Sequence, residues 1–231
     1  MIFNLLILAH LLGDFILQPN SWVSDKENRK LKSKYLYFHV LIHTVLSFVF
    51  LWNIELWWIP ALVGISHFII DSAKIQFQNV KTKKRWFFID QILHIAVIAG
   101  IAFYCNEFNF EFLKDQNYLK IVVAALFLTA PTSIIIRTLL SSWTPVAEEQ
   151  SNIQTESLSS AGKYIGILER LLVFTFIIVN HWEGVGFMVA AKSVFRFSDL
   201  AQAKQRKLTE YVLIGTLLSF GMAVLTGILF K

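Results

Sequence analysis

One apolar run decides the fold class of this chain: WIPALVGISHFIIDSAK, at residues 58–74. Its length approaches the ~20 residues that cross a bilayer as a helix. His67 and Asp71 stand four residues apart in it, so an α-helix places both on one face. Burying an Asp at the centre of a membrane helix costs at least ~2.5 kcal/mol, and such residues are normally there for function. The run therefore predicts a transmembrane helix with a functional polar face.

The same spacing recurs in three further apolar runs, all within residues 1–105. Their pairs are His10 with Asp14, His39 with His43, and Asp90 with His94. The arrangement also repeats: a His and Asp pair, a basic loop and a pair ending in His occur twice in succession. Two such hairpins would form a four-helix core whose polar residues face its axis, as in metal-binding bundles.

Composition supports a membrane protein. The 231 residues are 55% hydrophobic and 16% charged, whereas a soluble domain averages about 25% charged. The net charge of +5 comes from short basic clusters between apolar runs, which is typical of cytoplasmic loops. We therefore expect the lipid bilayer as a partner and no nucleic acid. Cys105 is the only cysteine, which excludes an internal disulfide.

The apolar runs predict an all-α, polytopic transmembrane bundle of seven or eight helices. We expect one integral membrane domain, 1–231, with the His/Asp-bearing helices in 1–105 and supporting helices in 106–231 that carry basic residues at the inner face. The N-terminal run lacks the features of a signal peptide and is expected to be retained. Pro131 is expected to kink the fifth run, and 184–197 either spans or re-enters. The expected helices are 2–17, 35–55, 58–74, 86–105, 119–140, 163–182, 184–197 and 210–230.

Orientation follows from the basic loops. Lys and Arg collect after the first, third and seventh runs, which predicts that these loops are cytoplasmic. All four polar pairs then fall in the cytoplasmic half of the membrane. This common depth favours one shared site over scattered interhelical hydrogen bonds or a proton relay, which are the simpler explanations for polar groups in membrane helices.

Imidazole and carboxylate groups together favour a divalent transition metal, zinc first, with one or two ions bound. No other cofactor is expected. Gly13, beside Asp14, would admit a backbone or a substrate closely because it has no Cβ, or it is a small packing residue. The expected metal ligands are His10, Asp14, His43, His67, Asp71 and His94, and the expected catalytic residues, as ligand or general base, are His39 and Asp90.

Cations near these pairs are what an anionic substrate requires, because Arg and Lys bind oxyanions. Their simpler role is to reach the inner interface and to neutralise nearby carboxylates. An anionic small molecule or a lipid head group is the expected partner. The residues expected to bind it are Gln18, Lys74, Arg170, Lys192 and Arg196.

The motif HLLGDFILQ at residues 10–18, with Lys26, the later His and Asp pairs and Gln91, resembles a bacterial membrane family known only as domain of unknown function 3307. The likeness is clearest over residues 5–95. It implies a multi-pass protein of the bacterial cytoplasmic membrane and brings no established activity. A looser similarity connects the chain to membrane-bound metal-dependent hydrolases, which also place His and Asp at helix ends.

These features predict a metal-dependent membrane hydrolase that acts at the cytoplasmic face on an anionic, phosphate-bearing or lipid-like substrate. A transporter of a transition-metal ion, or a proton-coupled carrier, is the first alternative, and its ligands should lie near mid-membrane. A sensor or scaffold with a structural metal is the second, and its ion should have a closed shell of protein ligands. The residues do not decide between enzyme and transporter, nor do they give the oligomeric state.

Overall fold

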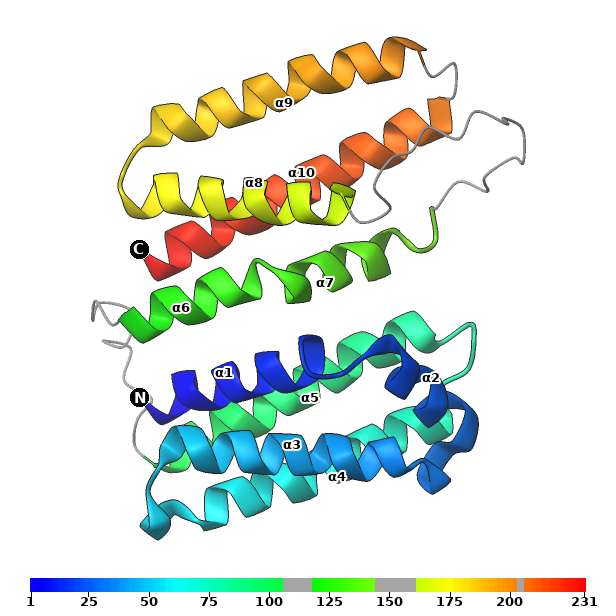
Figure 1. Ribbon diagram of the computed structural model, residues 1–231, viewed down its shortest axis with the longest axis vertical. Helices are drawn as coiled ribbons and strands as arrows, with labels where there is room; N and C mark the ends of the chain where they lie inside the picture. The colour runs from blue at the N-terminus through cyan, green and yellow to red at the C-terminus, as the bar shows by residue number, and fades with distance from the viewer. Residues whose placement is uncertain (106–117, 144–160, 203–205) are drawn as a thin grey trace. The chain divides into compact units, whose positions relative to one another are not determined.

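The computed structural model describes residues 1–105, 118–143, 161–202 and 206–231, with the side chains of 161, 195–202 and 206–209 left out of the description. Within these ranges the regular secondary structure is helical, as expected (Figure 1). The chain divides into two compact units, Met1–Val123 and Ala124–Lys231. The expectation of a single integral membrane domain stays a prediction.

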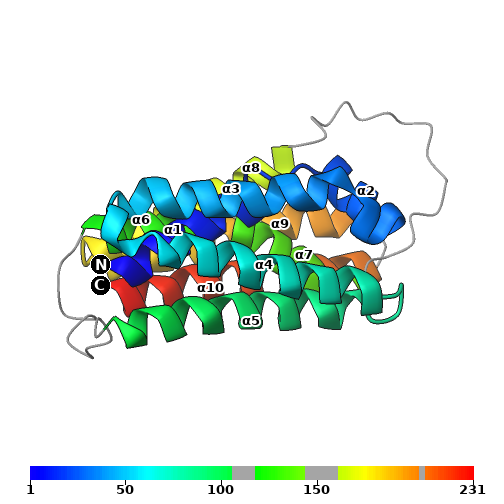
Figure 2. The ribbon, with the colours of Figure 1, turned by 90° about the horizontal axis from the view of Figure 1, so that it is seen from below.

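The first unit is built around a ring of four long helices. Helix α1 packs on α3 and α5, and α4 packs on the same two helices, so that the ring closes (Figures 1 and 2). The sequence predicted four helices in this region, although α1 ends two residues earlier than expected and α4 continues three residues further. The four helices are α1 (Ile2–Phe15), α3 (Lys34–Leu51), α4 (Trp58–Phe77) and α5 (Lys83–Tyr104).

The sequence had suggested that the first basic segment is an open loop, but the structure shows helices there. The segment forms helix α2 (Asn20–Arg29) and a 3-10 turn (Lys30–Lys32), and the axis bends by 78° between α1 and this segment. A second 3-10 turn, Ile54–Leu56, joins α3 to α4. Pro19 explains the break, because it removes a backbone donor where α1 would have continued and then stands at the N-cap of α2.

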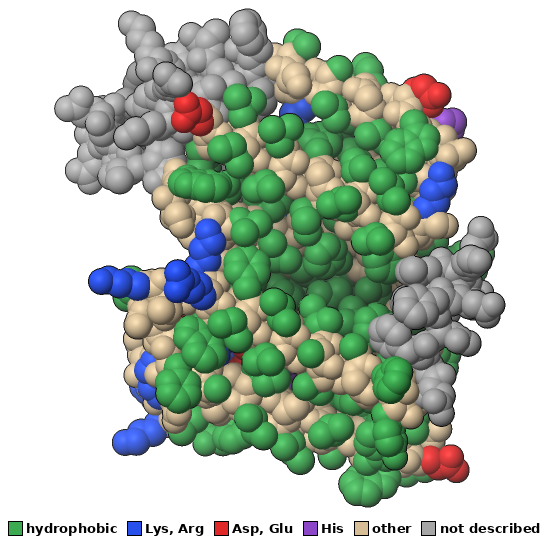
Figure 3. Space-filling view, turned by 180° about the vertical axis from the view of Figure 1, so that it is seen from behind, with side chains coloured by type: hydrophobic (Ala, Val, Ile, Leu, Met, Phe, Trp, Pro, Cys, Tyr) green, Lys and Arg blue, Asp and Glu red, His purple; other side chains and the backbone are tan. Residues whose placement is uncertain are grey.

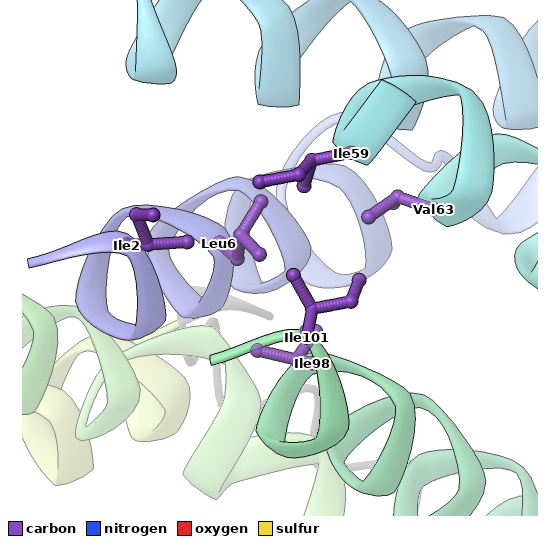
Figure 4. Packing of buried hydrophobic residues seen from close by; sticks show 6 residues of the cluster. All are labelled: Ile2, Leu6, Ile59, Val63, Ile98 and Ile101. Carbon is purple, nitrogen blue, oxygen red and sulfur yellow. The ribbon is translucent and has the colours of Figure 1, made fainter. Parts of the chain in front are cut away.

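The interior of the bundle changes character along its length. One end is an apolar core of buried side chains from α1, α4 and α5 (Figure 4). Towards the other end of the bundle, His10 follows Leu6 by four residues on one helix, and His67 follows Val63 by four residues on another, so each stays on the same helix face. The inward stripe thus continues from aliphatic to ionisable groups because the helical period is kept. The apolar core consists of Ile2, Leu6, Ile59, Val63, Ile98 and Ile101.

The outside of this bundle is apolar. Leu41, Ile65 and Ile92, from three different helices, are 55%, 61% and 64% exposed. In the lower half of Figure 3, hydrophobic side chains cover the flank while Lys and Arg side chains gather at one end. Exposed aliphatic side chains around a buried polar interior are what a bilayer requires, because lipid replaces water at the flank.

Among the described residues, five helical segments are long and apolar enough to cross a membrane, or six if the bent pair of α1 with α2 and its 3-10 turn is one span. Multiple apolar helices indicate a multi-pass membrane protein, as expected. The expectation of seven or eight spans exceeds the five or six that pass on length and composition. It included runs now seen as α8 (Ala161–Ile178) and α9 (Trp182–Gln202), which are helical but are not among the spans that pass on length and composition.

In the second unit, α8 packs on α7 (Ala130–Leu140), α9 and α10 (Arg206–Phe230). Helix α6 (Tyr118–Phe127) crosses the boundary between the units and ends just before α7. The predicted effect of Pro131 is confirmed: the fifth run is interrupted here, and Pro131 stands in the first turn of α7, where proline is tolerated.

Candidate metal centre

Three imidazoles converge on one carboxylate inside the first unit. Asp14 Oδ1 lies 3.1 Å from Nε2 of His39, 3.1 Å from Nε2 of His43 and 3.4 Å from Nε2 of His67. The Nε2 atoms of His39 and His67 are themselves 3.1 Å apart. One ligand atom from each of these four residues lies within 4.8 Å of the other three. Helices α1, α3 and α4 each contribute to this group, so only the closed bundle assembles it.

Two further groups adjoin the first and share members with it. His67, Asp71 and His94 form one, and Asp14, Asp90 and His94 form the other. Nε2 of His94 lies 3.7 Å from Asp71 Oδ1 and 3.5 Å from Asp90 Oδ1. The three groups therefore form one continuous cluster across α1, α3, α4 and α5. The buried His and Asp groups have the composition and spacing to hold a metal ion.

The hydrogen-bonding pattern also fits a cation. A neutral imidazole nitrogen either donates or accepts, so several Nε2 atoms facing one another cannot all be satisfied by protons. Among the described buried atoms without a hydrogen-bond partner are Asp90 Oδ1 and His94 Nε2, which face each other, and His39 Nδ1. An unpaired buried polar atom is costly. A cation between the lone pairs would remove this cost at Asp90 and His94.

Two lysines neutralise the cluster from its basic end. Lys26 Nζ donates to Asp71 Oδ2 at 2.8 Å, and Lys74 Nζ donates to Asp90 Oδ2 at 2.7 Å. Lys26 is 6% exposed although it belongs to α2, in the segment expected to be a cytoplasmic loop. Sequence reasoning did not include Lys26 in the site: its charge and spacing do not separate it from the neighbouring loop lysines, and its place in the family motif was the signal that could have identified it.

Gln91 was also missed. Its amide nitrogen donates to Asp14 Oδ2 at 2.8 Å and to Asp90 Oδ2 at 3.2 Å, and its Oε1 lies 3.2 Å from His10 Nε2. His10, an expected ligand, belongs to none of the three groups, and its Nε2 is 3.8 Å from Asp14 Oδ2. The adjacency of Gln91 to Asp90 and its place in the motif that carries the family resemblance were the sequence signals that could have identified it. The structure thus places His10 and Gln91 beside the cluster, where they orient Asp14.

A small cavity adjoins the imidazoles on the side of the apolar core. Its volume is about 10 Å³, which is close to the minimum for one water molecule. His43, His67 and His94 line it together with Ser47, whose buried hydroxyl has no hydrogen-bond partner. The cluster is therefore enclosed on this side, and nothing larger than an ion or water fits beside these imidazoles.

Gly13 permits the closest approach in the site. A Cβ at this position would lie 2.4 Å from both Cε1 and Nε2 of His43. The sequence suggested that a backbone or a substrate approaches this glycine, and the group found there is instead an imidazole of the cluster. Gly13 is thus a packing residue that lets the His43 ring face Asp14.

The other expected substrate-binding residues occupy different surroundings. The amide nitrogen of Gln18 is buried without a hydrogen-bond partner. In the second unit, Lys192 donates to the carboxylate of Glu169, and the side chain of Arg196 lies outside the described residues. No position relative to the cluster follows for Lys192 or Arg196.

The guanidinium of Arg170 is hydrogen-bonded at the break between α6 and α7. It donates to the carbonyl oxygens of Leu128 and Thr129 at the break in the helix, and to the hydroxyls of Ser133 and Ser219. These contacts account for its burial, because a buried guanidinium needs acceptors and a carbonyl at a helix break needs a donor. A role for Arg170 in substrate binding stays a prediction.

This fold and this cluster define a helical membrane protein with a buried His/Asp group in its N-terminal bundle. A family model described as protein of unknown function (DUF3307) matches residues 2–123, more than half of the chain, and the chain belongs to that family. The matched region coincides with the first compact unit, and it holds the whole cluster. No curated protein and no solved structure matches the chain.

Proposed function

We propose that this protein is a metal-dependent hydrolase of the bacterial cytoplasmic membrane that acts on an anionic, phosphate-bearing substrate through a two-ion centre. The observation that carries this proposal is that the three possible ligand groups adjoin one another at Asp14, His67 and His94, so the cluster offers enough ligand atoms for two neighbouring ions. Two-metal hydrolytic sites hold their ions about 3.5–4 Å apart. Two ammonium groups beside the ligands add the positive charge that an anionic substrate needs.

The first ion is assigned to Asp14, His39, His43 and His67. Three imidazoles and one carboxylate make a four-ligand set, which suits Zn²⁺ and gives it a closed shell. In this assignment His39 acts as a ligand and not as a general base. An imidazole Nε2 has one lone pair, so His67 serves this ion alone.

The second ion is assigned to Asp71, Asp90 and His94. Nε2 of His94 lies 3.7 Å from one oxygen of Asp71 and 3.5 Å from one oxygen of Asp90. Three protein ligands would leave a coordination position for water or substrate, as in catalytic zinc sites. A bound ion there would activate a water molecule and polarise the scissile bond. Asp90 is then also a ligand, and Gln91 and His10 keep Asp14 oriented between the two ions.

The two carboxylates proposed for the second ion lie towards the basic end of their helices. His67 is the tenth of 20 residues in α4, and His94 is the twelfth of 22 in α5, so both lie near the middle of their helices. Asp71 and Asp90 lie about 6 Å nearer the basic end, because each is four residues from its histidine. These carboxylates therefore lie on the side where basic side chains gather, which supports access from the cytoplasmic face.

Metal analysis combined with a turnover assay tests this function. The full chain in nanodiscs, loaded with Zn²⁺, is expected to release phosphate from phosphomonoesters and lipid phosphates, and Asp90→Asn is expected to abolish release. Asp25→Asn is the matched control, since Asp25 bonds Ser33 and Arg29 away from the cluster. A chain that holds two ions but releases nothing from these substrates would reject the hydrolase.

Transport of a transition-metal ion is the second candidate. It is favoured by the enclosure of the cluster and by a neighbouring cavity of only about 10 Å³, which suits an ion better than a head group. Proteoliposomes containing an internal metal indicator would show saturable Zn²⁺ or Mn²⁺ entry that Asp14→Asn removes. Entry equal to that of empty liposomes would exclude the carrier.

A further inference from the structure

We propose that Lys26 and Lys74 form a subsite for a phosphate-type dianion, and that the second metal ion binds only together with that anion. The inference rests on the proposed two-ion centre and adds its substrate class and its order of loading. The two lysines reach the cluster from different elements, α2 and α4, and contact the carboxylates on either side of His94.

Each of these carboxylates divides its two oxygens between two neighbours. The Oδ1 atoms of Asp71 and Asp90 face His94 Nε2, and their Oδ2 atoms accept from Lys26 and Lys74. An ion held by the two Oδ1 atoms and His94 would therefore have an ammonium group across each carboxylate. Each ammonium group would thus stand one carboxylate away from the ion, and an ammonium group has three N–H donors, so donors remain for an anion bound beside it.

Charge arithmetic makes the anion necessary. With neutral imidazoles, as metal ligation requires, the cluster holds three carboxylates, Asp14, Asp71 and Asp90, and two ammonium groups, for a net charge of −1. One divalent ion brings the net charge to +1, and a second brings it to +3. Unbalanced charge in a low-dielectric interior is strongly unfavourable. A dianion such as a phosphomonoester or a phosphonate returns the total to +1.

Of the two lysines, Lys74 is the one that reaches the surface. The side chain of Lys74 is 24% exposed, whereas that of its partner Asp90 is 1% exposed and that of Lys26 is 7% exposed. Lys74 thus connects the buried carboxylates to the surface, and Lys26 closes the site from α2. A dianion at the basic end would meet Lys74 first and would reach the ion without crossing the apolar half of the bundle.

The test counts Co²⁺ ions bound to the full chain in nanodiscs of phosphatidylcholine, because Co²⁺ accepts the same ligands as Zn²⁺ and absorbs visible light. We expect one tightly bound ion without added anion and two with millimolar methylphosphonate, which should tighten the second ion about tenfold or more. Acetate at equal ionic strength should have no effect. A count of two ions without any anion, or a count that methylphosphonate leaves unchanged, would overturn the proposal.

Charge-deleting variants give the sharper comparison. The double variant Lys26→Met, Lys74→Met lacks both ammonium groups, so the net charge of the cluster with two ions falls from +3 to +1. This variant is therefore expected to bind two Co²⁺ ions without an anion. Its tightly bound first ion also reports that the fold is intact. Lys83→Met is the matched control, because Lys83 pairs with Glu27 outside the cluster, and it should behave as the unmodified chain. A double variant that holds one ion and still requires methylphosphonate for the second would overturn the proposal.

A further arm identifies the source of the dianion. Phosphatidic acid in the nanodisc carries the same phosphomonoester chemistry as methylphosphonate. A second ion bound in these discs without soluble anion assigns the subsite to a lipid phosphate, and a second ion that requires methylphosphonate assigns it to a soluble one. The ion count does not depend on turnover, so the two proposals can fail separately. If the second ion requires the anion but no substrate is hydrolysed, the proposed reaction alone is rejected. If a substrate is hydrolysed but the second ion binds without the anion, the subsite alone is rejected.

Discussion

Replacing Gly13 by alanine tests whether His43 is a ligand, without altering any polar group. A Cβ on Gly13 would lie 2.4 Å from Cε1 and Nε2 of the His43 ring, whereas ordinary contact begins at 3.4 Å. The ring must therefore move by roughly 1 Å. Metal–ligand distances tolerate only about 0.2 Å, so this movement would remove His43 from the four-ligand group.

The expected magnitudes separate metal binding from stability. Overpacking costs about 1–3 kcal/mol, and replacing glycine within a helix returns about 0.5–1 kcal/mol. The net loss of stability is thus modest, on the order of 1–2 kcal/mol. Loss of an outer-shell partner lowers metal affinity about 10- to 100-fold, so displacing a direct ligand should lower it by more than about 100-fold.

A Co²⁺ titration against a competing chelator measures the affinity, and thermal unfolding of the same sample measures stability. Gly100→Ala is the matched control, because Gly100 lies in the same bundle and a Cβ there would meet nothing within 4 Å. It should leave metal affinity unchanged and raise stability slightly. Unchanged affinity in Gly13→Ala, with the chain folded, would refute the assignment of His43 as a ligand.

Three further outcomes are expected. Asp71→Asn should destabilise the fold by about 3–5 kcal/mol, because it leaves the ammonium of Lys26 buried without its carboxylate. Adding Lys26→Met should restore much of this stability, as measured by thermal unfolding. Simple additivity of the two changes would contradict the pairing. Arg170→Met should remove the donor to the Leu128 carbonyl, at about 1–3 kcal/mol. Limited proteolysis should then cut within 124–231 sooner while Co²⁺ binding persists, and loss of Co²⁺ would contradict a purely structural role. A membrane-impermeant maleimide applied from the periplasmic side should label Cys105 and should spare a Lys83→Cys variant that lacks Cys105, because the two positions lie at opposite ends of α5; the reverse pattern would invert the orientation derived from the basic loops.

Family, fold class and cluster could all be predicted from the sequence, for reasons that lie within single helices. Apolar length predicts membrane helices, and a spacing of four places His67 with Asp71, or Asp90 with His94, on one face. The family resemblance is confirmed, as are the all-α fold and the gathering of His and Asp in the first half. Helix ends were less accurate, because capping and the Pro19 break act over one or two residues.

The sequence by itself determined which faces of which helices are polar, because helical periodicity sets the angular position of each side chain about its own axis. Only the tertiary structure decided which of those side chains meet: it brought Lys26 from α2 onto Asp71, set Gln91 between His10 and Asp14, and packed His43 against Gly13. Periodicity carries no information about the rotation or register of one helix against another, or about where a connecting segment folds back. Packing of the closed four-helix ring determines both.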